Sequence, residues 1–141
     1  MKKIILAMVA VMVPLMLSAG STDFWFRHFS VEDGLSSSAV RAIMQDKYGF
    51  MWLGTDDGLN RYDGTTIKIY RLNPEGVNDY ISFLYDTTDR IWIGTGDGVY
   101  IYNYETENFE PFKLLTAKGD SIKTNVNHIA EDRDGNLWFS T

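Results

Sequence analysis

The chain contains the stretch Ile43-Met44-Gln45-Asp46-Lys47-Tyr48-Gly49-Phe50-Met51-Trp52-Leu53-Gly54-Thr55-Asp56-Asp57-Gly58-Leu59-Asn60-Arg61-Tyr62-Asp63-Gly64. Its pattern recurs, since residues 46, 86 and 132 are Asp, residues 52, 92 and 138 are Trp, and residues 55, 95 and 141 are Thr. A period of about 40 to 46 residues is typical of stacked supersecondary units that cannot bury their hydrophobic faces alone. We therefore interpret the sequence as two copies of one unit followed by the start of a third.

Each copy is expected to consist of short antiparallel strands. The strand-like segments cover 40–46, 50–55, 59–63 and 66–72 in the first copy, 81–87, 91–95, 99–103 and 109–115 in the second, and 126–132 and 136–141 in the third. Asp-Gly and similar turn residues separate them, and Asp-Gly between apolar runs is a strong hairpin signal. Aromatic residues predict one further strand over 23–29, and 116–124 reads as an inserted loop.

Four short antiparallel strands in a unit of this length are typical of a β-propeller blade. We therefore predict an all-β fold with about two and a half blades of four antiparallel strands, forming an incomplete ring. A sandwich or barrel would also have many short strands, but it would not repeat the Asp, Trp, Gly-Thr and Asp-Gly frame. Because propellers usually close with about 4 to 8 blades, we expect this chain to be the N-terminal part of a longer protein.

The N-terminus reads as an export signal. Lys2 and Lys3 precede an apolar run from Ile4 to Leu17, and small residues follow. This order predicts a secretory signal peptide over 1–20, cleaved near Ala19 or Gly20. The run is shorter than the ~20 residues of a transmembrane helix, and the absence of cysteine from the sequence excludes a lipoprotein anchor.

The predicted divisions of the chain follow from the repeat. They are the signal peptide (1–20), an N-terminal strand and entry loop (21–39), blade 1 (40–80), blade 2 (81–125) and the first half of a truncated blade 3 (126–141). Without the signal peptide, the basic residues fall from 13 to 11 against 19 acidic ones, a net charge of −8. An acidic domain without a basic stripe is a poor partner for nucleic acid, and a chain without cysteine cannot use disulfides.

The quoted stretch closely resembles the two-component regulator propeller repeat. The preceding segment Phe29-Ser30-Val31-Glu32-Asp33-Gly34-Leu35-Ser36 resembles the entry segment of that family. The second copy departs from the pattern at Asp89-Arg90, where the other copies have Gly49-Phe50 and Gly135-Asn136. The resemblance covers residues 25–141.

The resemblance implies an exported sensor of the bacterial periplasm. Full-length members of this family carry two propellers, a membrane-proximal β-sandwich, a transmembrane helix, a histidine kinase and a response-regulator module, and they sense glycan breakdown products. The resemblance therefore implies an oligosaccharide ligand and, as partners, the remaining blades and kinase modules of the parent chain. It also implies a dimeric full-length form. Since no kinase sequence is present, we expect this chain to be no enzyme by itself.

Four residues are candidates for ligand binding. Asp56, Asp57 and Asp97 lie in the loops between the second and third strands, where carboxylates could face sugar hydroxyls, although Asp and Gly in such loops often serve turn geometry alone. Trp25 lies outside the repeat frame and could stack on a sugar ring. The loops are expected to share a face with the connections between blades.

The residues of the repeat frame read as structural. The tryptophans are Trp52, Trp92 and Trp138; they could stack on sugars, but their internal strand position favours packing between blades. The aspartates are Asp46, Asp86 and Asp132, which we expect to accept hydrogen bonds from turn amides. Asp132, Asp134 and Asn136 have the spacing of a calcium loop, but Leu137 stands where such a loop needs glycine. We predict no metal site, cofactor or catalytic residue; His28 and His128 have no metal-ligand spacing.

Two other functions stay open on the sequence alone. An exported propeller could be part of a polysaccharide lyase or hydrolase, whose paired carboxylates cannot be chosen without geometry. The chain could also be a truncated remnant without function of its own, because two and a half blades leave apolar faces and strand edges open.

Overall fold

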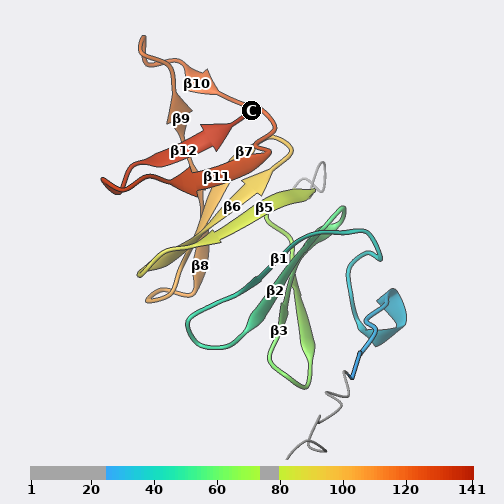
Figure 1. Cartoon of the computed structure of the whole chain (residues 1–141). Coiled ribbons are helices and arrows are strands. Elements are labelled where there is room, and N and C mark those ends of the chain that lie inside the picture. Colours follow the sequence, from blue (N-terminus) through green and yellow to red (C-terminus); the bar gives the residue numbers. More distant parts are fainter. Residues whose placement is uncertain (1–24, 74–79) are drawn as a thin grey trace, which may run out of the picture.

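The computed structural model describes residues 25–73 and 80–141, and almost all of its regular structure is β (Figure 1). The first sheet has the order β1-β2-β3-β4 and the second β5-β6-β7-β8, all antiparallel. Their bounds are β1 Val40–Gln45, β2 Met51–Thr55, β3 Gly58–Tyr62, β4 Ile67–Tyr70, β5 Ile81–Asp86, β6 Arg90–Thr95, β7 Gly98–Asn103 and β8 Asn108–Phe112. Two hairpins follow, from β9 Leu114–Leu115 with β10 Ser121–Ile122, and from β11 His128–Glu131 with β12 Leu137–Ser140.

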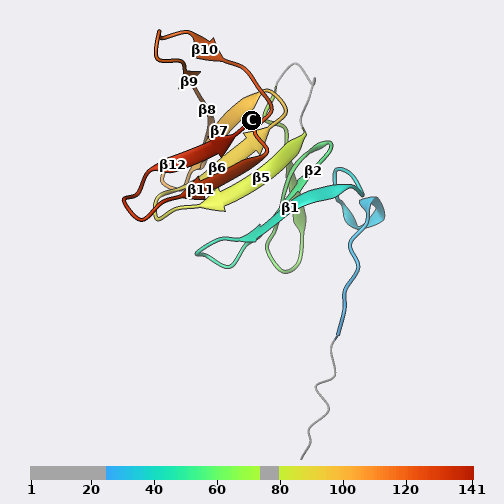
Figure 2. The same cartoon turned by 45° about the horizontal axis from the view of Figure 1, so that its top comes forward.

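The sheets stack as blades. The first strands of successive units are neighbours, with β5 against β1 and β11 against β5, and the two views show three layers in chain order (Figures 1 and 2). The predicted fold class is therefore confirmed: the chain forms two four-stranded propeller blades and the first hairpin of a third, and the ring is not closed.

The core lies between blades. One cluster joins the first two sheets through Trp52, Leu59, Ile81 and Tyr102, among others. A second joins the second sheet to the β11–β12 hairpin through Trp92, Val99, Val126 and Ile129. This arrangement follows from the sequence, because a sheet with apolar residues on both faces must be covered by a neighbour on each side.

The glycine of the Gly-Thr frame permits the close approach of blades. A Cβ atom at Gly54 would lie 2.5 Å from Cγ2 of Ile81 on β5, and one at Gly94 would lie 3.0 Å from the carbonyl oxygen of Val126. Both distances are shorter than van der Waals contact. The second strand of each blade therefore needs glycine where the chain entering the next blade crosses it.

The structure differs from the sequence prediction at two connections. The described part of the predicted strand 23–29 forms no strand; a 3₁₀ helix, Val31–Asp33, follows it, closed by a capping box in which Ser30 and Asp33 bond reciprocally. The expected strand 109–115 is broken after Phe112, and its end, β9, pairs with β10 from the predicted loop 116–124. The predicted signal peptide lies outside the described residues.

A third difference concerns Asp86. The sequence frame aligns it with Asp46 and Asp132, but β5 extends one residue further, so Asp86 pairs with Ile91 as Gln45 pairs with Met51. The following turn is one residue shorter, and it lacks a glycine with positive φ such as Gly49. A shift of one residue turns a side chain to the opposite face of a strand, so Asp86 faces away from its own turn.

Candidate functional site

Three of the four predicted ligand residues, Asp56, Asp57 and Asp97, lie at the end of the sheets that carries the β2–β3 and β6–β7 turns, here called the turn face. The amide of Asp56 donates to the carbonyl of Ala39, just before β1, and the amide of Gly96 donates to that of Tyr80, just before β5. The turns therefore share this face with the chain entering each blade, as the sequence predicted.

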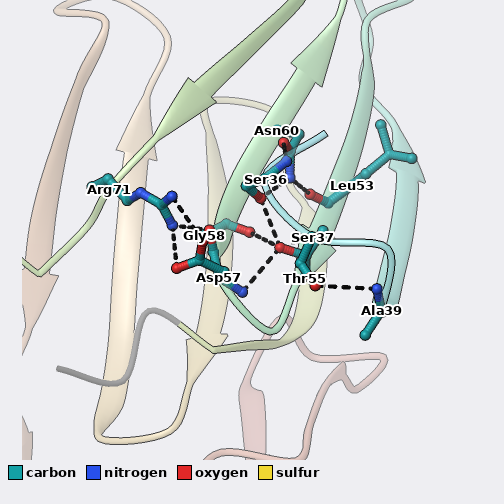
Figure 3. A network of polar contacts seen from close by, with 9 residues as sticks. All are labelled: Ser36, Ser37, Ala39, Leu53, Thr55, Asp57, Gly58, Asn60 and Arg71. Atoms are coloured by element: carbon teal, nitrogen blue, oxygen red, sulfur yellow. Dashed lines mark hydrogen bonds and ion pairs between the residues drawn. The ribbon is translucent and has the colours of Figure 1, made fainter. Parts of the chain in front are cut away.

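Thr55 and Thr95 build the two turns in the same way. Each hydroxyl donates to the carbonyl of the glycine three residues later, at 2.9 Å for Thr55 and 3.0 Å for Thr95, and accepts from the amide two residues later. The Thr55 hydroxyl also lies 2.8 Å from that of Ser36, and Asn60, which is fully buried, donates to the same Ser36 hydroxyl (Figure 3). This network fastens the entry segment to blade 1.

Asp56 and Asp57 are engaged by arginines. Arg41 holds Asp56 with a bidentate contact of 2.7 and 3.1 Å, and these hydrogen bonds lower the pKa of the Asp56 carboxyl. Arg71 pairs with Asp57 at 2.6 Å and also donates to its carbonyl oxygen (Figure 3). Both pairs are exposed to solvent, where an ion pair contributes little to stability. Each of the two carboxylates nevertheless has an arginine as its counter-ion.

Asp97 has a different setting. Its carboxylate accepts a hydrogen bond of 2.9 Å from Thr95, and it borders a hollow of about 250 Å³. The hollow lies between the second sheet and the β9–β10 hairpin and is lined by Asp97, Gly98, Val99, Tyr100, Pro111, Phe112, Lys113, Ser121 and Lys123. We call it the Asp97 hollow. Lys113 and Lys123 have no ion pair within the described part of the chain, so two lysines and one aspartate line this hollow without pairing.

Trp25 does not join these residues. It is 92% exposed in an irregular segment, and nearby Arg27 donates to the hydroxyl of Tyr62 at 2.7 Å. Tyr62 is the last residue of β3, at the end opposite to the β2–β3 turn. The structure therefore separates Trp25 from Asp56, Asp57 and Asp97.

The repeat-frame tryptophans differ in burial. Trp52 is fully buried between the two sheets and Trp92 is 9% exposed against the β11–β12 hairpin, whereas Trp138 is 66% exposed. No described strand covers the face of β12 on which Trp138 lies. Burial thus follows the presence of a following blade.

The repeat-frame aspartates also differ. Asp46 accepts from the amides of Tyr48 and Phe50 and from the indole of Trp52, and Asp132 makes the corresponding bonds in the third turn. Asp86 instead accepts from the amide of Lys47 in the neighbouring blade, at 3.2 Å, and from the hydroxyl of Tyr104, at 2.8 Å. Its contacts link the two blades rather than closing its own turn.

Sequence reasoning missed a second hollow, at the opposite end of the sheets. It measures about 230 Å³ and is lined by Asp46, Tyr48, Phe50, Arg61, Tyr102, Tyr104 and Glu107. The sequence signal was weak: one tyrosine, Tyr48, lies in a turn of the first repeat, and two, Tyr102 and Tyr104, lie at the end of β7 and just after it in the second. Their proximity depends on how the blades pack.

The described ranges 25–73 and 80–141 have neither a metal-ligand group nor a membrane-spanning helix. They contain no group of three His, Cys, Asp or Glu side chains placed to hold a metal ion. They also contain no helix with the length and apolar character needed to cross a bilayer.

The fold thus defines a segment of a β-propeller. The family model for the two-component regulator propeller matches residues 34–57 and 121–141. These two segments match the two-component regulator propeller repeat, and the resemblance predicted from the sequence is confirmed.

Individual proteins similar to this chain support the same resemblance. The extracellular domain of a hybrid two-component system from B. thetaiotaomicron is 32% identical, with a TM-score of 0.69 over 82% of this chain and 17% of its own. That of a second such system is 23% identical, with a TM-score of 0.60 over 86% of this chain and 18% of its own, and supports the fold alone. Histidine kinase P4 of Formosa agariphila is 56% identical over 59 residues, which are 42% of this chain and 4% of that protein. The chain thus spans less than a fifth of each of these relatives.

Proposed function

We propose that this chain is the N-terminal part of the extracellular sensor of a hybrid two-component system, exported to the periplasm, and that it detects oligosaccharides. The observation that carries the proposal is the propeller architecture shared, at 32% identity, with the extracellular domain of such a system. The predicted signal peptide supports export. The match to a histidine kinase supports an output through kinase modules elsewhere in the parent protein.

The Asp97 hollow is the best candidate for ligand contact on the turn face. Ligand sites combine apolar walls with a few polar groups that fix orientation, and here Val99 and Phe112 form walls beside Asp97, Lys113 and Lys123. The carboxylate can accept hydrogen bonds from sugar hydroxyls, and the two ammonium groups can donate to sugar oxygens. Asp56 and Asp57 serve as anchors of their turn.

A ligand in this hollow would touch two structural parts. Asp97 and Phe112 belong to the second sheet, while Ser121 and Lys123 belong to the inserted β9–β10 hairpin. Binding across both would favour arrangements in which the hairpin is closed onto the sheet. A ligand shifts a conformational equilibrium by its difference in affinity for the two states, so this closure is a route by which occupancy could bias the rest of the sensor.

We propose binding without catalysis. In a lyase or hydrolase, acid and base groups must converge on one reacting bond. The carboxylates of the turn face instead point to arginines and to a turn hydroxyl.

The test uses the full-length protein that contains this chain, expressed in its host with a transcriptional reporter. Oligosaccharides from enzymatically digested polysaccharides should activate the reporter, and Asp97→Asn should reduce the response at limiting ligand by about tenfold, as expected when a charged hydrogen-bond partner is lost. Asp120→Asn, an exposed carboxylate in the same hairpin region, is the matched control. Shortening of a polysaccharide by the purified protein, or a reporter unresponsive to every oligosaccharide, would contradict the proposal.

A further inference from the structure

The second hollow, here called the Arg61 pocket, lies where blades 1 and 2 meet. The β1–β2 turn contributes Tyr48 and Phe50, β3 contributes Arg61, and β7 with its following turn contributes Tyr102 and Glu107. At about 230 Å³ it is smaller than the ~300–1,000 Å³ pockets of drug-sized ligands. It therefore suits a ligand of about one sugar ring.

Arg61 is the unusual group in its wall. Its guanidinium carbon lies 4.6 Å from the ring centroid of Phe50 and 5.7 Å from that of Trp52. Among the described residues it forms no ion pair, unlike Arg41 and Arg71. A guanidinium held over aromatic rings keeps its donors in a fixed plane, and that fork matches a carboxylate with two parallel hydrogen bonds.

The Asp46 carboxylate in the wall of the pocket is already hydrogen-bonded. One Asp46 oxygen accepts from the amides of Tyr48 and Phe50, and the other accepts from the Trp52 indole at 2.7 Å. Asp46 therefore closes its own turn, and within the described residues it forms no ion pair with Arg61.

The other walls offer partners for hydroxyl groups. Tyr102 is 3% exposed, and its hydroxyl has no hydrogen bond within the described structure. Because no fully buried side-chain polar atom in the described structure lacks a partner, this hydroxyl retains some exposure, and Tyr102 lines the pocket. Glu107 has φ = 53°, a left-handed conformation that non-glycine residues seldom adopt, and this residue lines the pocket. The ring of Tyr48, 63% exposed, forms an apolar lip.

We propose that the Arg61 pocket binds one carboxylated sugar ring, a hexuronate unit. Arg61 takes the carboxylate, Glu107 and the Tyr102 hydroxyl take ring hydroxyls, and Tyr48 lies against the apolar face of the ring. The choice of a sugar rests on the proposed function, whereas the carboxylate follows from the unpaired Arg61. The pocket lies at the end of the blades opposite to the Asp97 hollow, so it is a separate site.

The experiment is calorimetric titration of the full-length extracellular domain with methyl glucuronide and, as the neutral counterpart, methyl glucoside. The glucuronide should bind at least about tenfold more tightly, and Arg61→Gln should reduce its affinity by about tenfold or more. Arg133→Gln, which removes an exposed arginine from the β11–β12 turn, should leave the affinity unchanged. Tyr48→Ala, at an exposed position where folding is not at risk, should weaken binding several-fold.

Three results would overturn the assignment. They are equal binding of glucuronide and glucoside, unchanged glucuronide affinity in a folded Arg61→Gln or Tyr48→Ala protein, and no binding of the glucuronide at concentrations up to about 10 mM, which corresponds to less than ~3 kcal/mol of binding free energy. If the reporter still responds to oligosaccharides in any of these cases, the sensor proposal stands and the pocket assignment alone fails.

Discussion

The indole nitrogen of Trp52 donates a hydrogen bond of 2.7 Å to the carboxylate of Asp46, six residues earlier in the chain. Trp138 and Asp132 repeat it at 2.9 Å. This bond ties the turn between the first two strands to the residue that fills the space between blades. Turn geometry and blade packing are thus coupled through one carboxylate.

Replacing Asp46 by Ala should lower the free energy of unfolding by about 1–3 kcal/mol, because two amides and a buried indole lose their acceptor. Urea denaturation followed by tryptophan fluorescence measures the loss. Asp134→Ala is the control, since that exposed residue uses only its backbone amide in the third turn. An equal loss of unfolding free energy in the two variants would show that the hydrogen bonds of the Asp46 side chain do not stabilise the fold.

Gly54→Ala should destabilise the contact between blades 1 and 2 by about 1–3 kcal/mol, as overpacking does. The added Cβ would lie 2.5 Å from Cγ2 of Ile81, a fully buried side chain. The double variant with Ile81→Ala removes that Cγ2 atom, so its destabilisation should be smaller than the sum of the two single effects. Strict additivity in the denaturation cycle would show that the two residues do not compete for space.

The Asp132 carboxylate in the β11–β12 turn should become protonated only at an unusually low pH. Hydrogen bonds from the Trp138 indole, and then from Asn136, lower the pKa of Asp132 from 3.8 to about 2. Because the folded pKa is depressed, the stabilisation by the ionised carboxylate is complete above about pH 3.8 and is lost as the pH falls through about 2. The NMR shift of the Trp138 indole proton should report this titration, and Asp132→Asn should abolish it. A midpoint near 3.8 would contradict the prediction.

Glu107→Gly should raise the free energy of unfolding by up to about 1 kcal/mol, because glycine accepts the left-handed φ of 53° without steric cost. Glu105→Gly, in the same turn but without positive φ, should lower it by about 0.5–1 kcal/mol. Thermal unfolding of both variants tests this. The same Glu107 variant should bind methyl glucuronide less tightly, so stability and binding would change in opposite directions.

Export predicts the mature N-terminus. N-terminal sequencing or intact mass of the protein recovered from the periplasm should place the first residue after Ala19 or Gly20, because small residues there follow the apolar run. A mature protein that retains Lys2 and Lys3 would exclude a cleaved signal peptide.

Much of the fold could be predicted because its determinants are local. Asp-Gly turns between apolar runs define hairpins within a few residues, and the recurrence of Trp52 and Trp92 shows that the hairpins repeat. Even the departure at Asp89, where the other copies have glycine, was visible in the sequence. Its consequence was not, because the loss of a left-handed residue shortened the turn and moved Asp86 by one position in the strand register.

The sequence by itself determined most strands and hairpin turns of the blades, and the apolar positions that a neighbouring blade can cover. Only the tertiary structure decided which residues from different blades meet. The Arg61 pocket joins residues 46 to 107 across two blades, and the burial of each repeat tryptophan depends on whether a described blade follows it. The physical reason is that strand and turn formation depend on neighbours in the chain, whereas pockets and burial depend on the packing of surfaces distant in sequence.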